Sequence, residues 1–244
     1  MRLLTRCRLS FGFATRDEDW LRKYFFGGLW ILLCPPFGWY MALGYRTEVG
    51  IRLQDGVKPV LPTWEGWRRY LVTGLRSGGV IQSFFVPYLL TLWLFAYQQN
   101  PVAVVQHWQA MLVFAATVVL LPPVGIGMMP AVYFYLFPWF SVSGGEAALL
   151  SVLFFGAAFM MPSAFMQVLR TRKYSSAFRL DRVVAFIAAH FVAYLEAWLV
   201  SLASVGVAMA TGVFAPWGLF WTYPAITYAF QSTFQDRLLI SLPR

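Results

Sequence analysis

The chain has 244 residues, of which 59% are hydrophobic and 12% are charged, and its mean hydropathy is +0.62. Soluble globular proteins contain roughly 25% charged residues, so this composition excludes an ordinary soluble domain. The formal net charge is +9. Because the basic residues flank apolar segments, they indicate contact with anionic lipid headgroups of a bilayer, and no nucleic-acid partner is predicted.

The basic residues are sorted along the chain. Between Arg76 and Arg170 there is no Lys, Arg or Asp, and Glu146 is the only Glu. All 19 Lys and Arg residues lie in an N-terminal tail, in two segments at 46–76 and 170–182, and in a C-terminal tail. The positive-inside rule places such segments on the cytoplasmic side of a membrane. We therefore expect both termini to be cytoplasmic.

The first apolar segment, residues 24–45, is interrupted by two prolines at Cys34-Pro35-Pro36-Phe37-Gly38. Because proline removes a backbone donor and clashes with the preceding turn, a straight helix through this point is not expected. A kinked span and a hairpin are the alternatives. Six basic residues precede the segment and six follow it as far as Arg76, which requires an even number of crossings. This favours a short or re-entrant hairpin that turns at Pro36 and Gly38.

The next segment, 46–77, is predicted to be a cytoplasmic loop that contains an interfacial amphipathic helix. Trp64 and Trp67 share a helical face, and Arg68 and Arg69 lie beside it. Indole rings at headgroup level with neighbouring arginines are typical of interface anchors.

The remainder of the chain predicts about six long transmembrane helices, so the fold class is an all-α polytopic membrane helix bundle. The expected spans are residues 79–97, 103–121, 125–140, 147–169, 188–213 and 219–235. The fourth and fifth are joined by a second interfacial amphipathic helix at 170–187, on the cytoplasmic side, and the last two form a C-terminal hairpin at 188–235. A single transmembrane domain at 24–237 thus lies between a basic tail at 1–23 and a short tail at 238–244.

Three turns share a Pro-x-Gly pattern, which favours the end of a helix. Their proline and glycine pairs are Pro36 and Gly38, Pro123 and Gly125, and Pro216 and Gly218. The pattern has two interpretations: a remnant of duplicated hairpins, as in many transporters, or three independent helix stops.

Small residues recur every four positions late in the chain, at Ser204, Ala208 and Gly212. Such a face lets another helix approach closely and gain dispersion contacts inside a membrane. We expect it to pack against another helix, of this chain or of a partner subunit.

Several short blocks follow one another in an order that resembles a known family. They are Asp19-Trp20-Leu21-Arg22-Lys23, Gly27-Gly28, Pro36-x-Gly38, Gly44-Tyr45, Pro62-x-Trp64, Ala177-Phe178-Arg179 and Tyr194-Leu195-x-Ala197-Trp198-Leu199. In this order the chain resembles domain-of-unknown-function family 4013 of prokaryotic membrane proteins. The resemblance implies an integral protein of the prokaryotic cytoplasmic membrane with hairpin-like halves, and it brings no established activity, ligand or catalytic residue.

Glu196 is the residue most suited to chemistry, because a carboxylate inside an apolar helix costs roughly 2.5–3.5 kcal/mol to insert. One interpretation is a group that handles protons or cations. The other is a structural role, either as a partner of Gln82, of Gln167 or of another subunit, or as a carboxylate that extends to the membrane interface from near the helix end.

His190 and His107 are the only histidines. They are too few for a metal site, which needs three or four ligands. No cofactor is predicted, although one His suffices to ligate a haem or a pigment, so His190 keeps that possibility open. No hydrolase elbow, phosphate loop or His-Glu-x-x-His motif is present, and an enzyme is the least favoured class.

Two function classes remain. The sequence favours a non-enzymatic subunit or assembly partner of a membrane complex, in contact with another membrane protein or with further copies of itself. The alternative is a small-solute or ion transporter that uses Glu196, supported by the broken helices.

Overall fold

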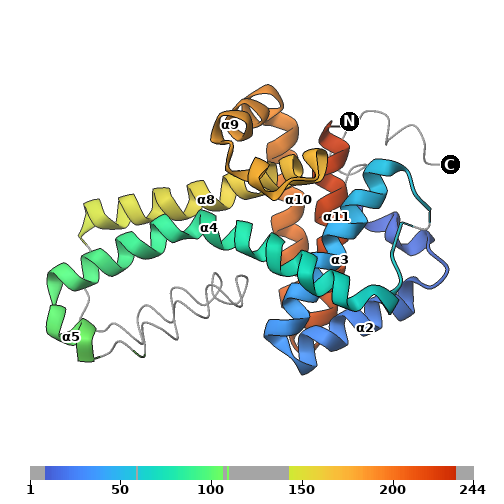
Figure 1. The fold of residues 1–244 in the computed structure, drawn as a ribbon, viewed down its shortest axis with the longest axis horizontal. Helices are drawn as coiled ribbons and strands as arrows, with labels where there is room; N and C mark the ends of the chain where they lie inside the picture. Colours follow the sequence, from blue (N-terminus) through green and yellow to red (C-terminus); the bar gives the residue numbers. More distant parts are fainter. Residues whose placement is uncertain (1–8, 59, 107–108, 110–142, 235–244) are drawn as a thin grey trace. The chain divides into compact units, whose positions relative to one another are not determined.

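The structure, a computed structural model, describes residues 9–58, 60–106, 109 and 143–234, and all regular structure in these ranges is helical (Figure 1). The α-helices are α2 (Trp20–Leu33), α3 (Pro35–Asp55), α4 (Trp67–Gln99), α5 (Pro101–Gln106), α8 (Gly144–Thr171), α9 (Leu180–Ala189), α10 (Phe191–Ala210) and α11 (Ala215–Phe234). Short 3-10 helices cover Ala14–Arg16, Trp64–Gly66, Tyr174–Phe178 and Gly212–Phe214.

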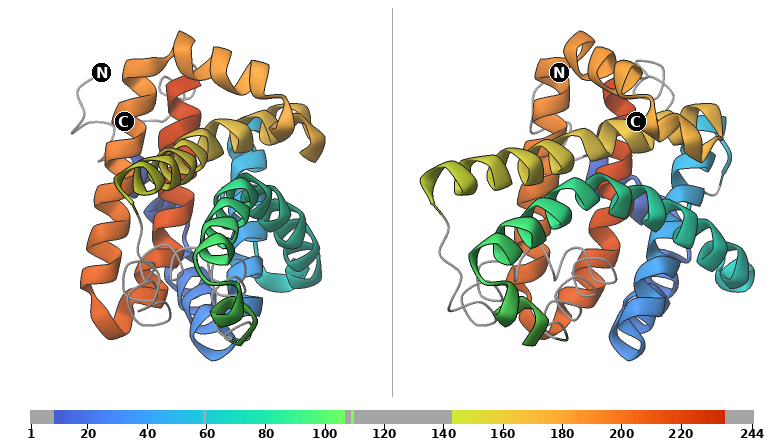
Figure 2. Two further views of the ribbon diagram at one scale, coloured as in Figure 1. Left: turned by 90° about the vertical axis from the view of Figure 1, so that its left-hand side faces the viewer. Right: turned by 60° about the vertical axis from the view of Figure 1, so that its left-hand side comes forward.

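The chain forms two compact units. The first contains residues 1–78 and 162–244, and the second contains residues 79–161. In the first unit α11 is the central helix, because it packs against α2, α3 and α10. Helices α10 and α11 lie side by side and form an antiparallel hairpin (Figure 2). This unit holds the site described below.

Helices α2 and α3 form the N-terminal hairpin, and the chain breaks at Cys34. The break lies earlier than predicted, because both prolines belong to the first turn of α3, where their missing N–H groups leave no bond unmade. Gly38 is inside α3, and a Cβ there would overlap the Trp30 carbonyl oxygen of α2. The glycine therefore permits the close contact of the two helices and does not form the turn.

Helix α3 continues to Asp55, so the prediction of a loop beginning at residue 46 is wrong. Residues 38–50 are all buried, including the charged Arg46 and Glu48. Local hydropathy assigns charged residues to solvent, whereas here they are held by tertiary contacts. Gly56, with φ of 68°, ends the helix in the left-handed conformation that glycine adopts readily.

Helix α4 runs without a break from Trp67 to Gln99, which corrects the prediction of an interfacial helix followed by a separate span at 79–97. The glycines between these parts weaken a helix by only about 1 kcal/mol each. Gly74 and Gly78 are both buried against Tyr40 of α3, so tertiary packing stabilises the helix where its propensity is low.

The second predicted interfacial helix is shorter than expected. Residues 174–178 form a 3-10 helix, α9 covers Leu180–Ala189, and a break at His190 separates α9 from α10. Val183 and Ile187 are buried, whereas Leu180 and Val184 are exposed. The segment is therefore amphipathic, and its contact with a membrane interface stays a prediction.

The turn between α10 and α11 lies at Thr211–Phe214 and not at Pro216–Gly218. Gly212 has φ of 58° and makes the turn. Pro216 belongs to the first turn of α11, and Gly218 lies against Ala208, where a Cβ would be 3.0 Å from the Ala208 Cα. The predicted turn at Pro123 and Gly125 lies outside the described residues.

In the second unit, the outer parts of α4 and α8 pack through aromatic rings. Phe154 lies 5.5 Å from Phe85 and 5.4 Å from Tyr88 between ring centroids. Helix α8 starts with a capping box, in which Ser143 N–H donates to Glu146 Oε2 at 2.8 Å and Glu146 N–H donates to Ser143 Oγ at 3.3 Å. Glu146 is thus a capping residue.

Three helical segments of the described chain are long and apolar enough to cross a membrane: Trp64–Gln99, Gly144–Thr171 and Phe191–Ala210. They include the predicted spans at 79–97 and 147–169 and most of the span at 188–213. The span at 219–235 corresponds to α11, which is helical but is not one of these three. The spans at 103–121 and 125–140 lie largely outside the described residues, so the total of six stays a prediction.

The two basic segments, 46–76 and 170–182, meet at one place. Arg172 Nη2 lies 2.6 Å from Asp55 Oδ1, and the Tyr174 hydroxyl donates to the Thr73 carbonyl at 3.4 Å. These contacts hold the two segments next to each other, as the predicted threading with both on one side of the membrane expects. Which side they face stays a prediction.

We expect a membrane-impermeant maleimide to leave single cysteines at Lys58 and Ser175 unlabelled in intact cells and to label both after permeabilisation. The background is a variant with Cys7 and Cys34 replaced by serine. A cysteine at Val213, an exposed position in the turn after α10, serves as the control and should be labelled in intact cells. Labelling of Lys58→Cys and Ser175→Cys from opposite sides would contradict the predicted threading.

Candidate functional site

The buried part of α3 carries two charged residues in adjacent turns. Glu48, 9% exposed, is neutralised by Arg69, whose Nη2 lies 2.8 Å from Glu48 Oε2, and by Arg52, whose Nε lies 3.5 Å from Oε1. Its charge therefore has a structural explanation. Arg46 has a different environment.

Arg46 is a buried cation, 8% exposed, and no carboxylate of the described residues lies within ion-pair distance. Its Nε donates to Thr227 Oγ1 of α11 at 2.9 Å. Its guanidinium carbon lies 4.9 Å from the Phe165 ring centroid and 5.9 Å from that of Tyr223. Such cation–π contacts offset only part of the cost of burying a charge.

Arg46 lies outside the three candidate spans, and burial lowers its pKa to about 10. The guanidinium therefore stays positively charged at neutral pH. A retained charge without a carboxylate partner is unusual in a protein interior.

Arg46 begins a row of polar contacts between α3 and α11. Positions 46, 50 and 54 of α3 are four residues apart and share a face, as do 227 and 231 of α11. One turn after the Arg46–Thr227 bond, Gln231 Nε2 donates to the Gly50 carbonyl at 2.7 Å. A Cβ at Gly50 would lie 2.7 Å from Leu169 Cδ1 of α8, so only glycine fits without movement. We call Arg46, Gly50, Gln54, Thr227 and Gln231 the polar seam.

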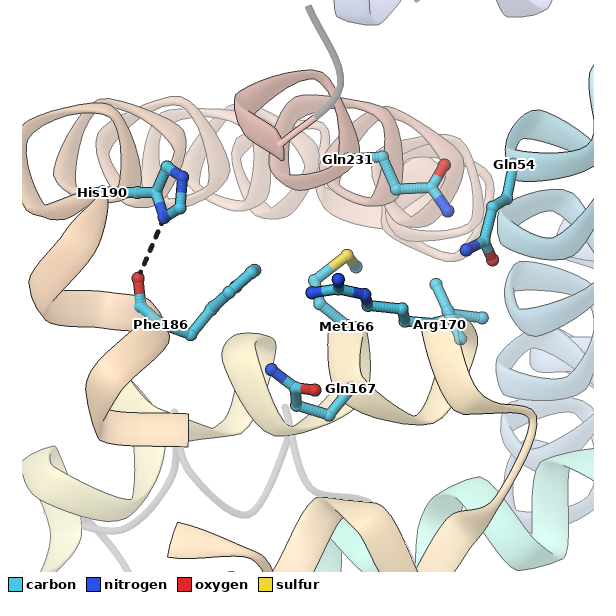
Figure 3. Close-up of a pocket in the computed structure, with 8 residues that line it drawn as sticks. Gln54, Met166, Gln167, Arg170, Phe186, His190 and Gln231 are labelled. Carbon is cyan, nitrogen blue, oxygen red and sulfur yellow. Dashed lines mark hydrogen bonds between the residues drawn. The ribbon is translucent and has the colours of Figure 1, made fainter. Parts of the chain in front are cut away.

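The seam ends at a pocket of about 400 Å³ (Figure 3). Its polar lining residues are Gln54, Gln167, Arg170, His190 and Gln231. Its apolar lining residues are Met166, Leu169 and Phe186. Helices α3, α8, α9 and α11 and the break after α9 thus each contribute to one cavity of small-ligand size.

Two amide oxygens of this site lack partners. Gln54 Oε1 and Gln231 Oε1 are buried and accept no hydrogen bond from the described residues. The orientation of the Gln231 amide follows from its donation to Gly50, which leaves the oxygen as the unpaired atom. A buried acceptor without a donor costs about 1–3 kcal/mol, so a donor from outside the chain would stabilise the site.

Two of the four polar residues predicted from sequence meet in this pocket. Gln167 is buried, and His190 is exposed at the end of α9, with its Nδ1 3.2 Å from the Phe186 carbonyl oxygen. Glu196 is half-buried on α10 and does not line the pocket. Gln82 belongs to the other unit. The structure therefore does not place Glu196 at the centre of a polar cavity.

The predicted interface anchors divide into two kinds. Trp64 packs inside the first unit, because its Nε1 donates to the Lys23 carbonyl at 2.9 Å and its ring stacks on Tyr45 at 4.8 Å. Trp67, Arg68 and Arg69 are exposed. Their contact with headgroups stays a prediction.

The small-residue face is occupied within the chain. Ser204 and Ala208 are buried, and α10 packs on α11, with Ala208 against Gly218. Gly212 is exposed in the turn and does not belong to this face. Close helix packing is thus present, but this face gives no independent support for a partner subunit.

Sequence analysis missed Arg46, Gln54, Arg170 and Gln231. A signal was present, since Arg46, Gly50 and Gln54, like Thr227 and Gln231, are spaced by four residues. Within the described residues no three His, Cys, Asp or Glu side chains gather as a metal site would require. Single-histidine ligation by His190 stays a prediction.

The sequence profile of the family described as protein of unknown function (DUF4013) matches residues 27–217 of the chain, a range that contains Arg46, Gln54 and Arg170 but not Thr227 or Gln231. No curated protein and no solved structure gives a significant match. Because the family profile covers most of the chain, the protein belongs to the DUF4013 family.

Proposed function

We propose that the protein is a small-solute permease of the prokaryotic cytoplasmic membrane and that the solute enters through the pocket and the polar seam. The observation that supports this proposal is the buried guanidinium of Arg46, which has no carboxylate partner among the described residues. Ionisable residues enclosed in membrane proteins commonly mark a substrate or ion pathway. A purely structural arginine in a protein interior would normally be paired with a carboxylate.

The proposed path has polar groups at successive positions along α3, from Gln54 at the pocket to Arg46. Gln54 lies eight residues after Arg46 on α3, which corresponds to about 12 Å of helix. Arg170 is exposed at the pocket and attracts anionic groups there. At the end of the seam away from the pocket, the positive charge of Arg46 would neutralise a negative group of the solute. The solute therefore carries at least one anionic group.

Replacement of Arg46 by methionine is expected to reduce solute-dependent currents at least about tenfold while the protein stays folded. Methionine fills the apolar volume between Phe165 and Tyr223, and replacing a buried charge by an apolar side chain is often neutral for stability. Currents are measured on a solid-supported membrane carrying proteoliposomes, with a panel of amino acids, organic acids and phosphate esters. Arg46→Lys should retain part of the signal, because the charge is kept.

Arg68→Met is the matched control, because Arg68 is exposed and stacks over the Trp67 ring with its guanidinium carbon 5.4 Å from the centroid. Its currents should equal those of the unmodified protein. Glu196→Gln tests the alternative in which that carboxylate couples transport to protons, and we expect it to have little effect. Unchanged currents in Arg46→Met, or no current for any solute with folded protein, would refute the proposal.

A second function, a non-enzymatic subunit of a membrane complex, is favoured by the outer face of α10. Val192, Leu195, Leu199 and Leu202 recur at helical spacing and are all exposed, which suits a neighbouring membrane protein or a second copy as well as lipid. Purification in mild detergent tests it. Co-elution of a membrane protein, or of further copies, at a fixed ratio supports the subunit role, whereas a monomer without currents refutes both functions.

A further inference from the structure

The pocket at the end of the seam presents two kinds of unsatisfied group. In the view of Figure 3, Gln54 and Gln231 lie on one side of the Arg170 guanidinium, and Phe186 and His190 lie on the other. The two glutamines offer buried carbonyl oxygens without donors, and the Gln231 side chain belongs to a residue only 5% exposed. Arg170 offers N–H donors and a positive charge, and no described carboxylate pairs with it.

These groups exclude the simpler ligand classes. An anion without hydrogen-bond donors satisfies Arg170 but leaves both amide oxygens unpaired. A cation without an anionic group satisfies the oxygens but is repelled by Arg170. A ligand with both an ammonium group and an anionic group satisfies the whole set and adds a charge-assisted hydrogen bond to the amide oxygens.

We infer that the pocket binds a zwitterion in which a primary ammonium and an anionic oxygen group are separated by a few bonds. The ammonium donates to Gln54 Oε1 and Gln231 Oε1, and the anionic oxygens accept from Arg170. This inference rests on the proposed function for the role of the site, but binding can be measured without transport. The same chemistry has two sources, the phosphoethanolamine headgroup of a membrane lipid and a free solute such as a small amino acid.

Phosphoethanolamine and phosphocholine are a matched pair of probes. Both carry a phosphate and a positively charged nitrogen, but the ethanolamine nitrogen is a primary ammonium with N–H donors, whereas the choline nitrogen is quaternary and has none. Isothermal titration of the purified full chain in detergent should show phosphoethanolamine binding at least about tenfold tighter than phosphocholine, and also tighter than inorganic phosphate or methylammonium alone. Glycine, a free zwitterion without phosphate, tests the amino-acid source in the same assay.

Gln54→Met removes one acceptor at nearly constant volume and should abolish most of the preference for phosphoethanolamine over phosphocholine. Gln231→Met removes the other acceptor but also the bond to Gly50, so its melting temperature is measured alongside. Arg170→Met should weaken both probes. Gln98→Met, an exposed position of α4, is the control and should bind as the unmodified protein does.

The two sources are separated by native mass spectrometry of protein extracted from the membrane. If the unmodified protein retains phosphatidylethanolamine and Gln54→Met loses it, the ligand is the lipid headgroup. If no lipid is retained but the protein binds glycine or phosphoethanolamine, the ligand is a free solute. Equal binding of phosphoethanolamine and phosphocholine, or no binding of any probe by folded protein, would overturn the inference. Zwitterion binding without currents would refute only the permease, and currents without an N–H preference would refute only this inference.

Discussion

Alanine at Gly44 or at Gly74 is expected to destabilise the protein by about 3 kcal/mol, because it forces α3 and α4 apart where they cross. A Cβ at Gly44 would overlap the Tyr70 carbonyl of α4, and one at Gly74 would overlap the Tyr40 carbonyl of α3. Backbone carbonyls inside helices cannot turn aside as a flexible side chain does. The measurement is the melting temperature of each variant in detergent, followed by light scattering and size-exclusion chromatography.

Gly206→Ala is the control for this crossing. Gly206 lies inside α10, and its added Cβ would meet nothing within 4 Å in the described part of the chain. Alanine there should be neutral or stabilising by up to about 1 kcal/mol, because alanine has the higher helix propensity. Melting of Gly44→Ala and Gly74→Ala at the same temperature as Gly206→Ala would show that the two helices do not approach as described.

The second large effect is expected at the buried ion pair of Asp17 and Lys23. Lys23 Nζ lies 2.8 Å from both Asp17 oxygens and also donates to the Leu61 carbonyl at 3.0 Å. The two side chains are only 7–8% exposed. Asp17→Ala leaves the ammonium buried without a counter-ion, and we expect a loss of about 3–5 kcal/mol.

A double variant shows how much of this loss of stability comes from the unpaired charge of Lys23. Asp17→Ala combined with Lys23→Met removes both charges and should recover most of the lost stability, since apolar groups of similar volume often replace a buried pair without cost. Asp55→Ala breaks the exposed pair with Arg172 and should cost at most about 1 kcal/mol. A melting temperature of Asp17→Ala close to that of Asp55→Ala would contradict the burial of the pair.

Elements with a strong apolar signal were predicted well. The predicted break near Cys34 is found between α2 and α3. The predicted helix at 147–169 is part of α8, and the predicted C-terminal hairpin consists of α10 and α11. Each depends on properties of neighbouring residues, such as paired prolines or a long apolar run. Hydropathy and turn preferences depend on residues close together in the sequence, so these three elements could be inferred from it.

Charged and glycine-rich segments were predicted poorly. The segment at 46–55 has four charged residues and was assigned to a loop, but its charges are held by Arg69, Thr227 and Arg172, which lie in distant parts of the chain. The Gly78–Gly79 pair in α4 suggested a boundary, but Gly78 packs on Tyr40 of α3. In both cases a tertiary contact outweighs the local preference.

The candidate site follows the same division. Glu196 attracted attention because it is a carboxylate in an apolar helix, which is a local observation. Arg46 and Gln231 meet α11 and α3 partners that are 181 residues distant in the chain. No spacing rule within one helix reveals which distant helix a polar face meets, so Gln54 and Gln231 could not be paired in advance.

The sequence by itself determined that this is a helical protein with apolar segments of membrane-spanning length and that its basic residues are excluded from them, because the cost of placing a charge in lipid acts on each segment separately. The tertiary structure alone decided which charges are buried, where the helices cross through Gly44 and Gly74, and that α3, α8 and α11 enclose a polar seam ending in a pocket. These features depend on the free energy of contacts between distant segments. A buried guanidinium or amide is acceptable only when such contacts form.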